Sequence, residues 1–203
     1  DFDVIYSCMI RSSDIATTAG PQPVHLRFSV DQYYKMYELG LIKDFEQIEI
    51  IDGELIKKMG IGERHAAVVN FLTRFFVLNC SGSIQVSIQN PLRLNDFDEP
   101  EPDVVLADLT KYDGKRHPRP EETILVVEVA DTSLRFDRQK KIPLYAEAGI
   151  SEVWIVNLLN DLIEVHQDPS EGIYQATRIF RPGEVVMSNA LPDLSLSVDD
   201  VLS

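Results

Sequence analysis

The chain has 203 residues, of which 44% are hydrophobic and 26% are charged, and its formal net charge is −14 at pH 7. This length and composition are typical of a folded protein with one domain rather than of a disordered chain. Proteins that bind nucleic acid nonspecifically are usually basic, so the excess of acidic residues argues against a general nucleic-acid binder.

Nothing in the sequence indicates a membrane or an oxidising compartment. No apolar run approaches the roughly 20 residues that cross a bilayer, and the first residues lack the basic start of a signal peptide. The two cysteines, Cys8 and Cys80, match no metal-binding spacing and no disulfide framework. We therefore expect a cytoplasmic protein that does not associate with membranes.

Residues 1–25 show no hydrophobic periodicity and include the loop-like stretch Ala-Gly-Pro-Gln-Pro at 19–23. This pattern predicts a flexible or peripheral N-terminal arm. The remainder, residues 26–203, contains no internal repeat and no low-complexity tract. We expect it to form a single domain.

A helix and a hairpin are predicted next. Ser29 and Gln32 match a capping box, and Gly40 matches a helix stop. Between two apolar runs over residues 48–56, Asp52-Gly53 is the strongest short-range signal for a β-hairpin.

The central part of the chain alternates helical and strand patterns. Apolar residues at helical spacing predict a helix over residues 65–79. A third helix is expected over 137–148, with a kink or late start at Pro143. Strands are predicted over 83–94, 104–107, 124–130 and 153–157, followed by an antiparallel meander over 162–186. This order predicts an α/β (α+β mixed) protein, with a mixed sheet that is flanked by helices.

One buried acid is the main functional signal. Glu128 interrupts an otherwise apolar strand, where a carboxylate is costly unless its charge is compensated. Asp103 precedes the previous strand, so neighbouring strands would bring both acids to one edge of the sheet. Carboxylates are the ligands that Mg²⁺ prefers, and Lys141 on the following helix could orient a water or stabilise negative charge.

Each of these residues also has a structural interpretation. Glu128 could pair with Arg135 or Arg138. His65 is expected at a helix start or core edge, because no partner His or Cys lies at ligand spacing. Four other side chains could simply face solvent: Lys140, Lys141, Glu49 and Glu54.

Taken together, the motifs resemble a known family. In chain order they are Glu49-x-x-Asp52-Gly53-Glu54, His65, Pro102-Asp103-Val104, Val127-Glu128-Val129-Ala130-Asp131-Thr132-Ser133, Asp137-Arg138-x-x-Lys141, Tyr145, Gly149 and Trp154-Ile155-Val156. From Phe28 to Asn157 this series is similar to the Uma-type family of putative restriction endonucleases, within the PD-(D/E)XK nuclease superfamily. The resemblance implies a restriction-endonuclease-like core, which is a central mixed sheet flanked by helices. The meander predicted over 162–186 would add antiparallel C-terminal strands to this core.

The resemblance also implies the site. Asp103 and Glu128 would ligate Mg²⁺ or Mn²⁺, Glu49 would support the site, and His65 would be a nearby polar residue. The superfamily lysine normally stands two residues after the glutamate, a position that Ala130 occupies here. The family moves this lysine to the following helix, where Lys141 matches better than its neighbour.

We therefore expect a metal-dependent, endonuclease-like phosphodiesterase that hydrolyses DNA, with weak nonspecific affinity for it, in a homodimer. Basic residues at 111–119 and 135–141 could form a rim around the acidic centre. Two alternatives stay open. One is a non-catalytic module of the same fold that binds nucleic acid or a protein partner, and the other is a structural oligomer whose acids form interface ion pairs.

Overall fold

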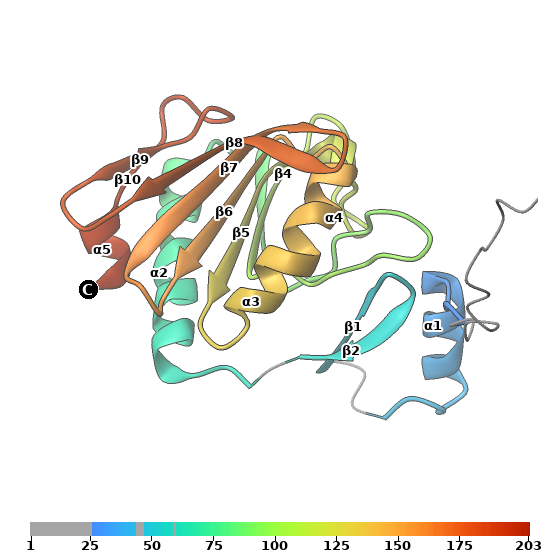
Figure 1. Ribbon diagram of the computed structural model, residues 1–203. Helices are drawn as coiled ribbons and strands as arrows, with labels where there is room; N and C mark the ends of the chain where they lie inside the picture. The colour runs from blue at the N-terminus through green and yellow to red at the C-terminus, as the bar shows by residue number, and fades with distance from the viewer. Residues whose placement is uncertain (1–25, 44–46, 59) are drawn as a thin grey trace, which may run out of the picture.

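The computed structural model describes residues 26–43, 47–58 and 60–203 (Figure 1). The arm predicted over residues 1–25 lies outside the described residues. Within the described ranges, no helix has both the length and the apolar character that a membrane span requires.

A six-stranded mixed sheet forms the centre of the protein, in the order β3-β4-β5-β6-β7-β8. Its strands are β3 (Ile84–Ile88), β4 (Val104–Asp108), β5 (Thr123–Ala130), β6 (Glu152–Asn157), β7 (Leu162–Ser170) and β8 (Ile173–Phe180). Neighbouring strands are antiparallel except β5 and β6, which run parallel. All side chains of β5 and β6 except that of Ile124 are buried, as expected for strands that are covered on both faces.

Helices cover both faces of this sheet (Figure 1). On one face lie α2 (Glu63–Asn79) and α5 (Val198–Leu202), which pack against β-strand residues such as Trp154. The other face carries α3 (Leu134–Phe136), a π-helical turn (Asp137–Lys141) and α4 (Ile142–Glu147). Tyr145 of α4 lies in the core on this second face. The predicted mixed sheet flanked by helices is confirmed.

The N-terminal part of the described chain forms a helix and a hairpin beside the sheet (Figure 1). The predicted capping box of Ser29 and Gln32 opens α1 (Val30–Glu38). The predicted hairpin consists of β1 (Ile48–Ile51) and β2 (Glu54–Lys57), which pair antiparallel. Val30, Tyr33 and Ile50 pack together and fix the hairpin against the helix.

Two predicted strand regions are shorter than expected. The strand predicted over 83–94 ends at Ile88, because Gln89 has a positive φ of 50° and Pro91 has no N–H to donate. In the region predicted as a meander over 162–186, β7 and β8 pair as expected. However, β9 (Val185–Met187) pairs with β10 (Ser195–Ser197) in a separate two-stranded sheet, because the turn at Pro182-Gly183 takes the chain away from β8.

The third helical segment begins earlier than predicted and contains a wide turn. It starts at Leu134 rather than Asp137, and the N–H of Ile142 donates to the carbonyl of Asp137, five residues back. Pro143 cannot donate, and its ring would clash with a carbonyl in a regular helix interior. The π-helical turn directly before Pro143 relieves this conflict.

Replacement of Gly53 by alanine should loosen the hairpin. Gly53 has a φ of +71°, and an added Cβ would lie 2.5 Å from the Cβ of Arg27. We expect Gly53→Ala to lower the free energy of unfolding by about 1–3 kcal/mol. In the matched control Gly82→Ala the new Cβ meets nothing within 4 Å, so its effect should be small. Equal stability of the two variants in denaturant titrations would contradict this account of the turn.

Candidate active site

Asp103 and Glu128 lie opposite each other on neighbouring strands. In the antiparallel register of β4 and β5, Val104 pairs with Val127, and one step further outward places Asp103 opposite Glu128. Side chains directly opposite each other in such a pair project from the same face of the sheet. This is the face covered by α3, the π-helical turn and α4. The expectation that both acids project from one edge of the sheet is met.

Asp103 is held by three nitrogen groups from different elements. Its Oδ2 accepts from the backbone N–H of Val129 at 2.8 Å and lies 3.1 Å from Nε2 of His65. Its Oδ1 accepts from the amide of Gln89 at 3.2 Å. His65 stands near the start of α2, as predicted, and its buried Nδ1 has no hydrogen-bond partner among the described residues. The orientation of the Asp103 carboxylate is therefore well defined.

Glu128 is almost completely buried and contacts the helical layer in front of the sheet. Its Oε1 accepts from the hydroxyl of Tyr145 at 2.5 Å and lies 3.3 Å from Nζ of Lys141. The alternative in which Glu128 pairs with Arg135 or Arg138 is wrong, because Arg138 pairs with Glu164 instead. Arg135 donates to the side chain of Gln139.

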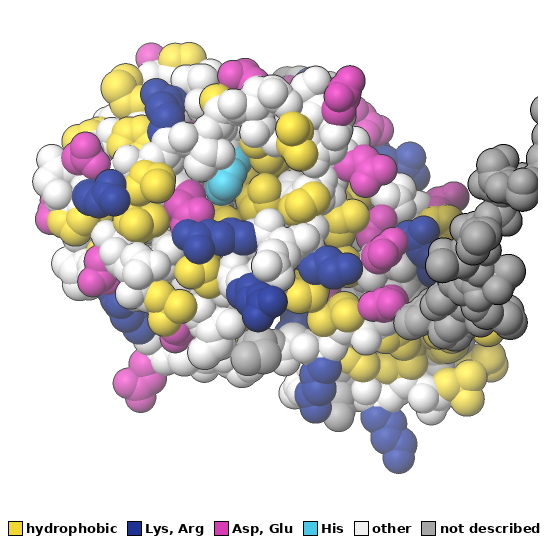
Figure 2. Space-filling view, in the orientation of Figure 1, with side chains coloured by type: hydrophobic (Ala, Val, Ile, Leu, Met, Phe, Trp, Pro, Cys, Tyr) yellow, Lys and Arg dark blue, Asp and Glu magenta, His cyan; other side chains and the backbone are white. Residues whose placement is uncertain are grey.

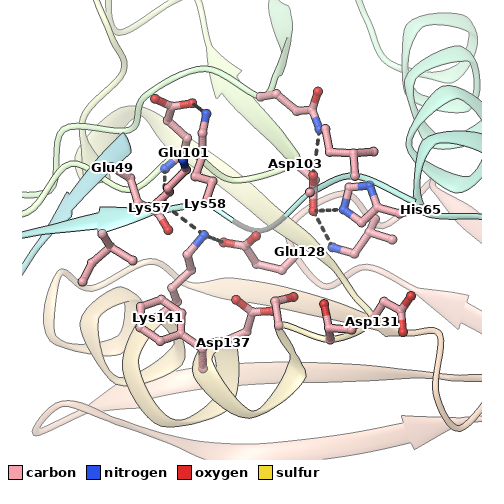
Figure 3. A pocket seen from close by; sticks show the side chains of 18 of the residues that line it. Glu49, Lys57, Lys58, His65, Glu101, Asp103, Glu128, Asp131, Asp137 and Lys141 are labelled. Carbon is pink, nitrogen blue, oxygen red and sulfur yellow. Dashed lines mark hydrogen bonds and ion pairs between the residues drawn. The ribbon is translucent and has the colours of Figure 1, made fainter. Parts of the chain in front are cut away.

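Lys141 contacts both Glu128 of β5 and Glu49 of the hairpin. Its Nζ lies 3.2 Å from Oε2 of Glu49 as well as near Glu128 (Figure 3). Glu49 projects inward from β1, and its Oε2 also accepts from the backbone N–H of Glu101 at 3.0 Å. The solvent-facing alternative is therefore wrong for Glu49 and Lys141, which are both buried. It holds for Lys140 and Glu54, which are exposed.

Negative charge exceeds positive charge at this buried position. Asp137 projects from the π-helical turn toward Glu128 (Figure 3). Burial, together with the charges of Asp137 and Asp103, raises the pKa of Glu128 to about 8, although Lys141 acts in the opposite direction. Burial also raises the pKa of Asp137 above its usual value. Lys141 is likewise buried, which lowers its pKa, but the attraction of Glu128 and Glu49 outweighs this effect and keeps the pKa above its usual value.

One pocket of about 720 Å³ is lined by Glu49, His65, Asp103, Glu128, Asp137 and Lys141. Its other walls come from the hairpin, residues 60–62, residues 89–91 and the segment 131–137. Figure 3 shows Glu49, Glu128 and Asp137 directed toward the same space from the hairpin, the sheet and the helical segment. The sequence therefore predicted a set of residues that the fold does bring together.

The residues present fit a divalent cation. The pocket gathers four buried carboxylates, from Glu49, Asp103, Glu128 and Asp137, around the single buried ammonium of Lys141. Within residues 26–43, 47–58 and 60–203, no three His, Cys, Asp or Glu side chains lie close enough to hold an ion by themselves. Mg²⁺ usually takes one or two carboxylates and completes its coordination with water and substrate oxygens, so two acids are sufficient.

Two members of the site had no predicted role at the metal. Asp137 appears only in the family pattern, although its position four residues before Lys141 puts the two side chains on the same side of a helix. Tyr145 appeared only in the family pattern. Its spacing of four residues from Lys141 was an available signal, because it puts both side chains on the same side of the helical segment.

The expected basic rim is sparse. Figure 2 shows Lys and Arg side chains scattered over the face that carries α3 and α4, with acidic side chains among and around them. Arg135, Arg138 and Lys140 are exposed in this segment. The charge of Arg138 is compensated by buried Glu164 at 2.5 Å. This face therefore has little surplus positive charge for binding phosphates.

Burial of Glu128 predicts a pH dependence of stability. The folded protein holds the Glu128 proton to about pH 8, whereas the usual pKa is 4.5, so the folded state binds this proton more tightly than the unfolded state. The resulting stabilisation is complete below about pH 4.5 and is lost as the pH rises through about 8. In chelator-treated protein, we expect the stability of the wild type to fall relative to that of Glu128→Gln between these limits, measured by denaturant titration.

Glu152→Gln provides the control, because Glu152 is a second buried glutamate that accepts from Trp154, Gln167 and two backbone N–H groups. This variant should be less stable at every pH because it disrupts satisfied hydrogen bonds. It should nevertheless keep the wild-type slope, since Glu128 is intact. An unchanged slope in Glu128→Gln would contradict the assignment.

Comparison with known proteins agrees with this architecture. The chain matches the family model Uma2, described as "Putative restriction endonuclease", over residues 30–199. It also resembles the crystal structure of a putative nuclease belonging to DUF820 from Anabaena variabilis ATCC 29413, with a TM-score of 0.67 and 16% sequence identity. That similarity covers 89% of this chain and 98% of the other, and at this identity it shows the fold. The comparison with curated proteins found no match. Because the family model covers most of the chain, the protein belongs to the Uma2 family of putative restriction endonucleases.

Proposed function

We propose that this protein is a metal-dependent endonuclease that hydrolyses DNA phosphodiester bonds in the pocket formed by Asp103, Glu128 and Lys141. The observation that carries this proposal is the strand register that sets Asp103 opposite Glu128, with the Lys141 ammonium 3.3 Å from the second carboxylate. Membership of a nuclease family supports the same reaction class.

Asp103 and Glu128 would hold the cation, which is Mg²⁺ or Mn²⁺. A bound divalent ion lowers the pKa of water and stabilises negative charge on a phosphate. Glu128 has to be ionised to take part. Its raised pKa in the metal-free protein means that ion binding and loss of the Glu128 proton are coupled.

Lys141 supplies the positive charge that belongs to the protein itself. Its ammonium is held between Glu49 and Glu128 and is therefore fixed in position. In hydrolysis, the oxygen of a water attacks phosphorus while the bond to one nucleoside oxygen breaks. Lys141 can orient that water or stabilise the charge that develops on the phosphoryl oxygens. Glu49 supports the reaction by holding Lys141.

His65 and the backbone of Val129 act on Asp103. Both lie within hydrogen-bond distance of Oδ2, which leaves Oδ1 with the weaker 3.2 Å contact to Gln89. We propose that His65 is a positioning residue, which fixes the carboxylate rotamer before an ion binds.

The alternative is a non-catalytic member of the family that binds nucleic acid or a protein partner. The net charge of −14 favours a module that binds a protein partner over one that binds nucleic acid, because a duplex is bound mainly through cations that neutralise its phosphates. The same charge is the reason why we expect weak nonspecific affinity for DNA. A role for the acids in interface ion pairs has less support, because Glu49 and Glu128 pair with Lys141 of the same chain. The homodimer stays a prediction.

Cleavage of DNA in Mg²⁺ or Mn²⁺ tests the proposal. Asp103→Asn and Glu128→Gln should abolish cutting, because each removes one of two ligands. Lys141→Ala should lower the rate by roughly 10²–10³-fold, as the loss of one charge-stabilising donor does in other enzymes. Lys140→Ala is the matched control and should cut at nearly the wild-type rate, since its side chain is exposed. If purified Asp103→Asn cuts as fast as the wild type, the activity lies elsewhere or belongs to a contaminant.

A further inference from the structure

Asp103 and Glu128 are buried in the lining of a pocket that is partly open to solvent. The side chains of Asp103 and Glu128 are only 12% and 4% exposed. The hairpin contributes Ile56 and Lys57 to one wall, and the π-helical turn contributes Asp137 and Lys141 to another. Residues 89–91 line a third side. A phosphate must therefore enter between these walls to reach the two carboxylates.

An intact duplex is poorly suited to such an approach. B-form DNA is stiff over about 150 base pairs, and its major groove alone is about 12 Å wide. A pocket of about 720 Å³ is in the range that accepts a small-molecule ligand, which corresponds to about one or two nucleotides. A single strand can bend at each nucleotide and place one phosphate inside.

The charges around the pocket also disfavour a long duplex. Three lysines line the pocket, and two of them already pair with acidic side chains. Lys58 pairs with Glu101, and Lys141 pairs with Glu49 and Glu128. Lys57 is exposed at the pocket. Few phosphates can therefore be neutralised at once, whereas tight duplex binding requires many such contacts.

Apolar side chains line the same pocket and would have no contact with a duplex phosphate backbone. Ile61 is 60% exposed beside the pocket, and Ile56 and Phe136 are partly buried in its lining. Proteins that bind single strands combine a positively charged groove with aromatic side chains on which unpaired bases stack. Phe136 is such a side chain in this lining, and Ile61 extends the apolar surface beside it. The lining thus offers a surface for a base next to the groups that would act on its phosphate.

We propose that the substrate of this pocket is an unpaired DNA strand, such as a single strand or a single-stranded tail, rather than an intact duplex. This inference rests on the proposed function, because it takes Asp103 and Glu128 as the groups that meet the phosphate. Ile61 and Phe136 contact the base of the nucleotide in the pocket, and the walls exclude its paired neighbour.

Three labelled DNA substrates of one sequence test this proposal: a single strand, a blunt duplex and a duplex with a single-stranded tail. In Mg²⁺ or Mn²⁺ we expect the single strand and the tail to be cut at least about tenfold faster than the blunt duplex. Cuts in the tailed substrate should be confined to its unpaired part. Internal cutting of the blunt duplex at the rate of the single strand would overturn the inference and leave the proposed function intact.

Binding separates the two proposals further. Fluorescence anisotropy with the same labelled DNAs should give a lower Kd for the single strand than for the duplex. Equal Kd values would overturn the inference, whether or not the protein cuts. Failure to cut any of the substrates, with the single-strand preference retained in binding, would instead overturn the proposed catalysis.

A pair of substitutions tests the apolar wall. Ile61→Ser should weaken single-strand binding several-fold, because it removes apolar surface from the pocket. Ile173→Ser is its control, since Ile173 is 59% exposed on β8 and does not line the pocket. Both variants should melt like the wild type, because neither side chain is buried. Equal single-strand binding by the two variants would remove Ile61 from the substrate site and overturn this contact.

Discussion

The contact between the Lys141 ammonium and the Glu128 carboxyl group, 3.3 Å apart, joins the central sheet to the helical layer at the point where the acidic side chains gather. Without the ammonium, Glu128 would be a buried acid among other acids, a costly arrangement in a low-dielectric environment. With it, the charge is only partly compensated, because the pKa of Glu128 is still raised to about 8. The fold therefore keeps a site that is short of positive charge, and this shortage is the basis of the proposed metal site.

The surrounding elements maintain this balance by geometry. The register of β4 and β5 sets Asp103 opposite Glu128. The π-helical turn before Pro143 buries Asp137 and Lys141 together. The hairpin adds Glu49 from outside the sheet, so three separate parts of the chain must fold before the site exists. The same hairpin narrows the approach to the acids, so one element affects both charge and access.

Local sequence patterns predicted the elements well and their contacts less well. The apolar run around Glu128 and the Asp52-Gly53 turn were sufficient to predict a buried strand and a hairpin. The side of the hairpin that faces inward was not predictable, because the burial of Glu49 depends on Lys141 nearly a hundred residues away. The position of Asp137 in the site was not predicted either. It depends on the π-helical turn, which forms because Pro143 does not fit a regular helix interior, and hydrophobic periodicity alone does not reveal such a turn.

Titration of the metal-free protein with Mn²⁺, followed by calorimetry and by melting temperature, tests the central claim most directly. We predict that the wild type binds the ion and melts at a higher temperature, with about 2.7 kcal/mol of stabilisation at ~100 times the dissociation constant. Glu128→Gln should lose most of this response, yet be as stable as the metal-free wild type or slightly more stable. The account would be contradicted if Mn²⁺ neither bound to the wild type nor raised its melting temperature, and if metal-free Glu128→Gln were strongly destabilised. Glu128 would then be a structural partner of Lys141 and Tyr145 rather than a metal ligand.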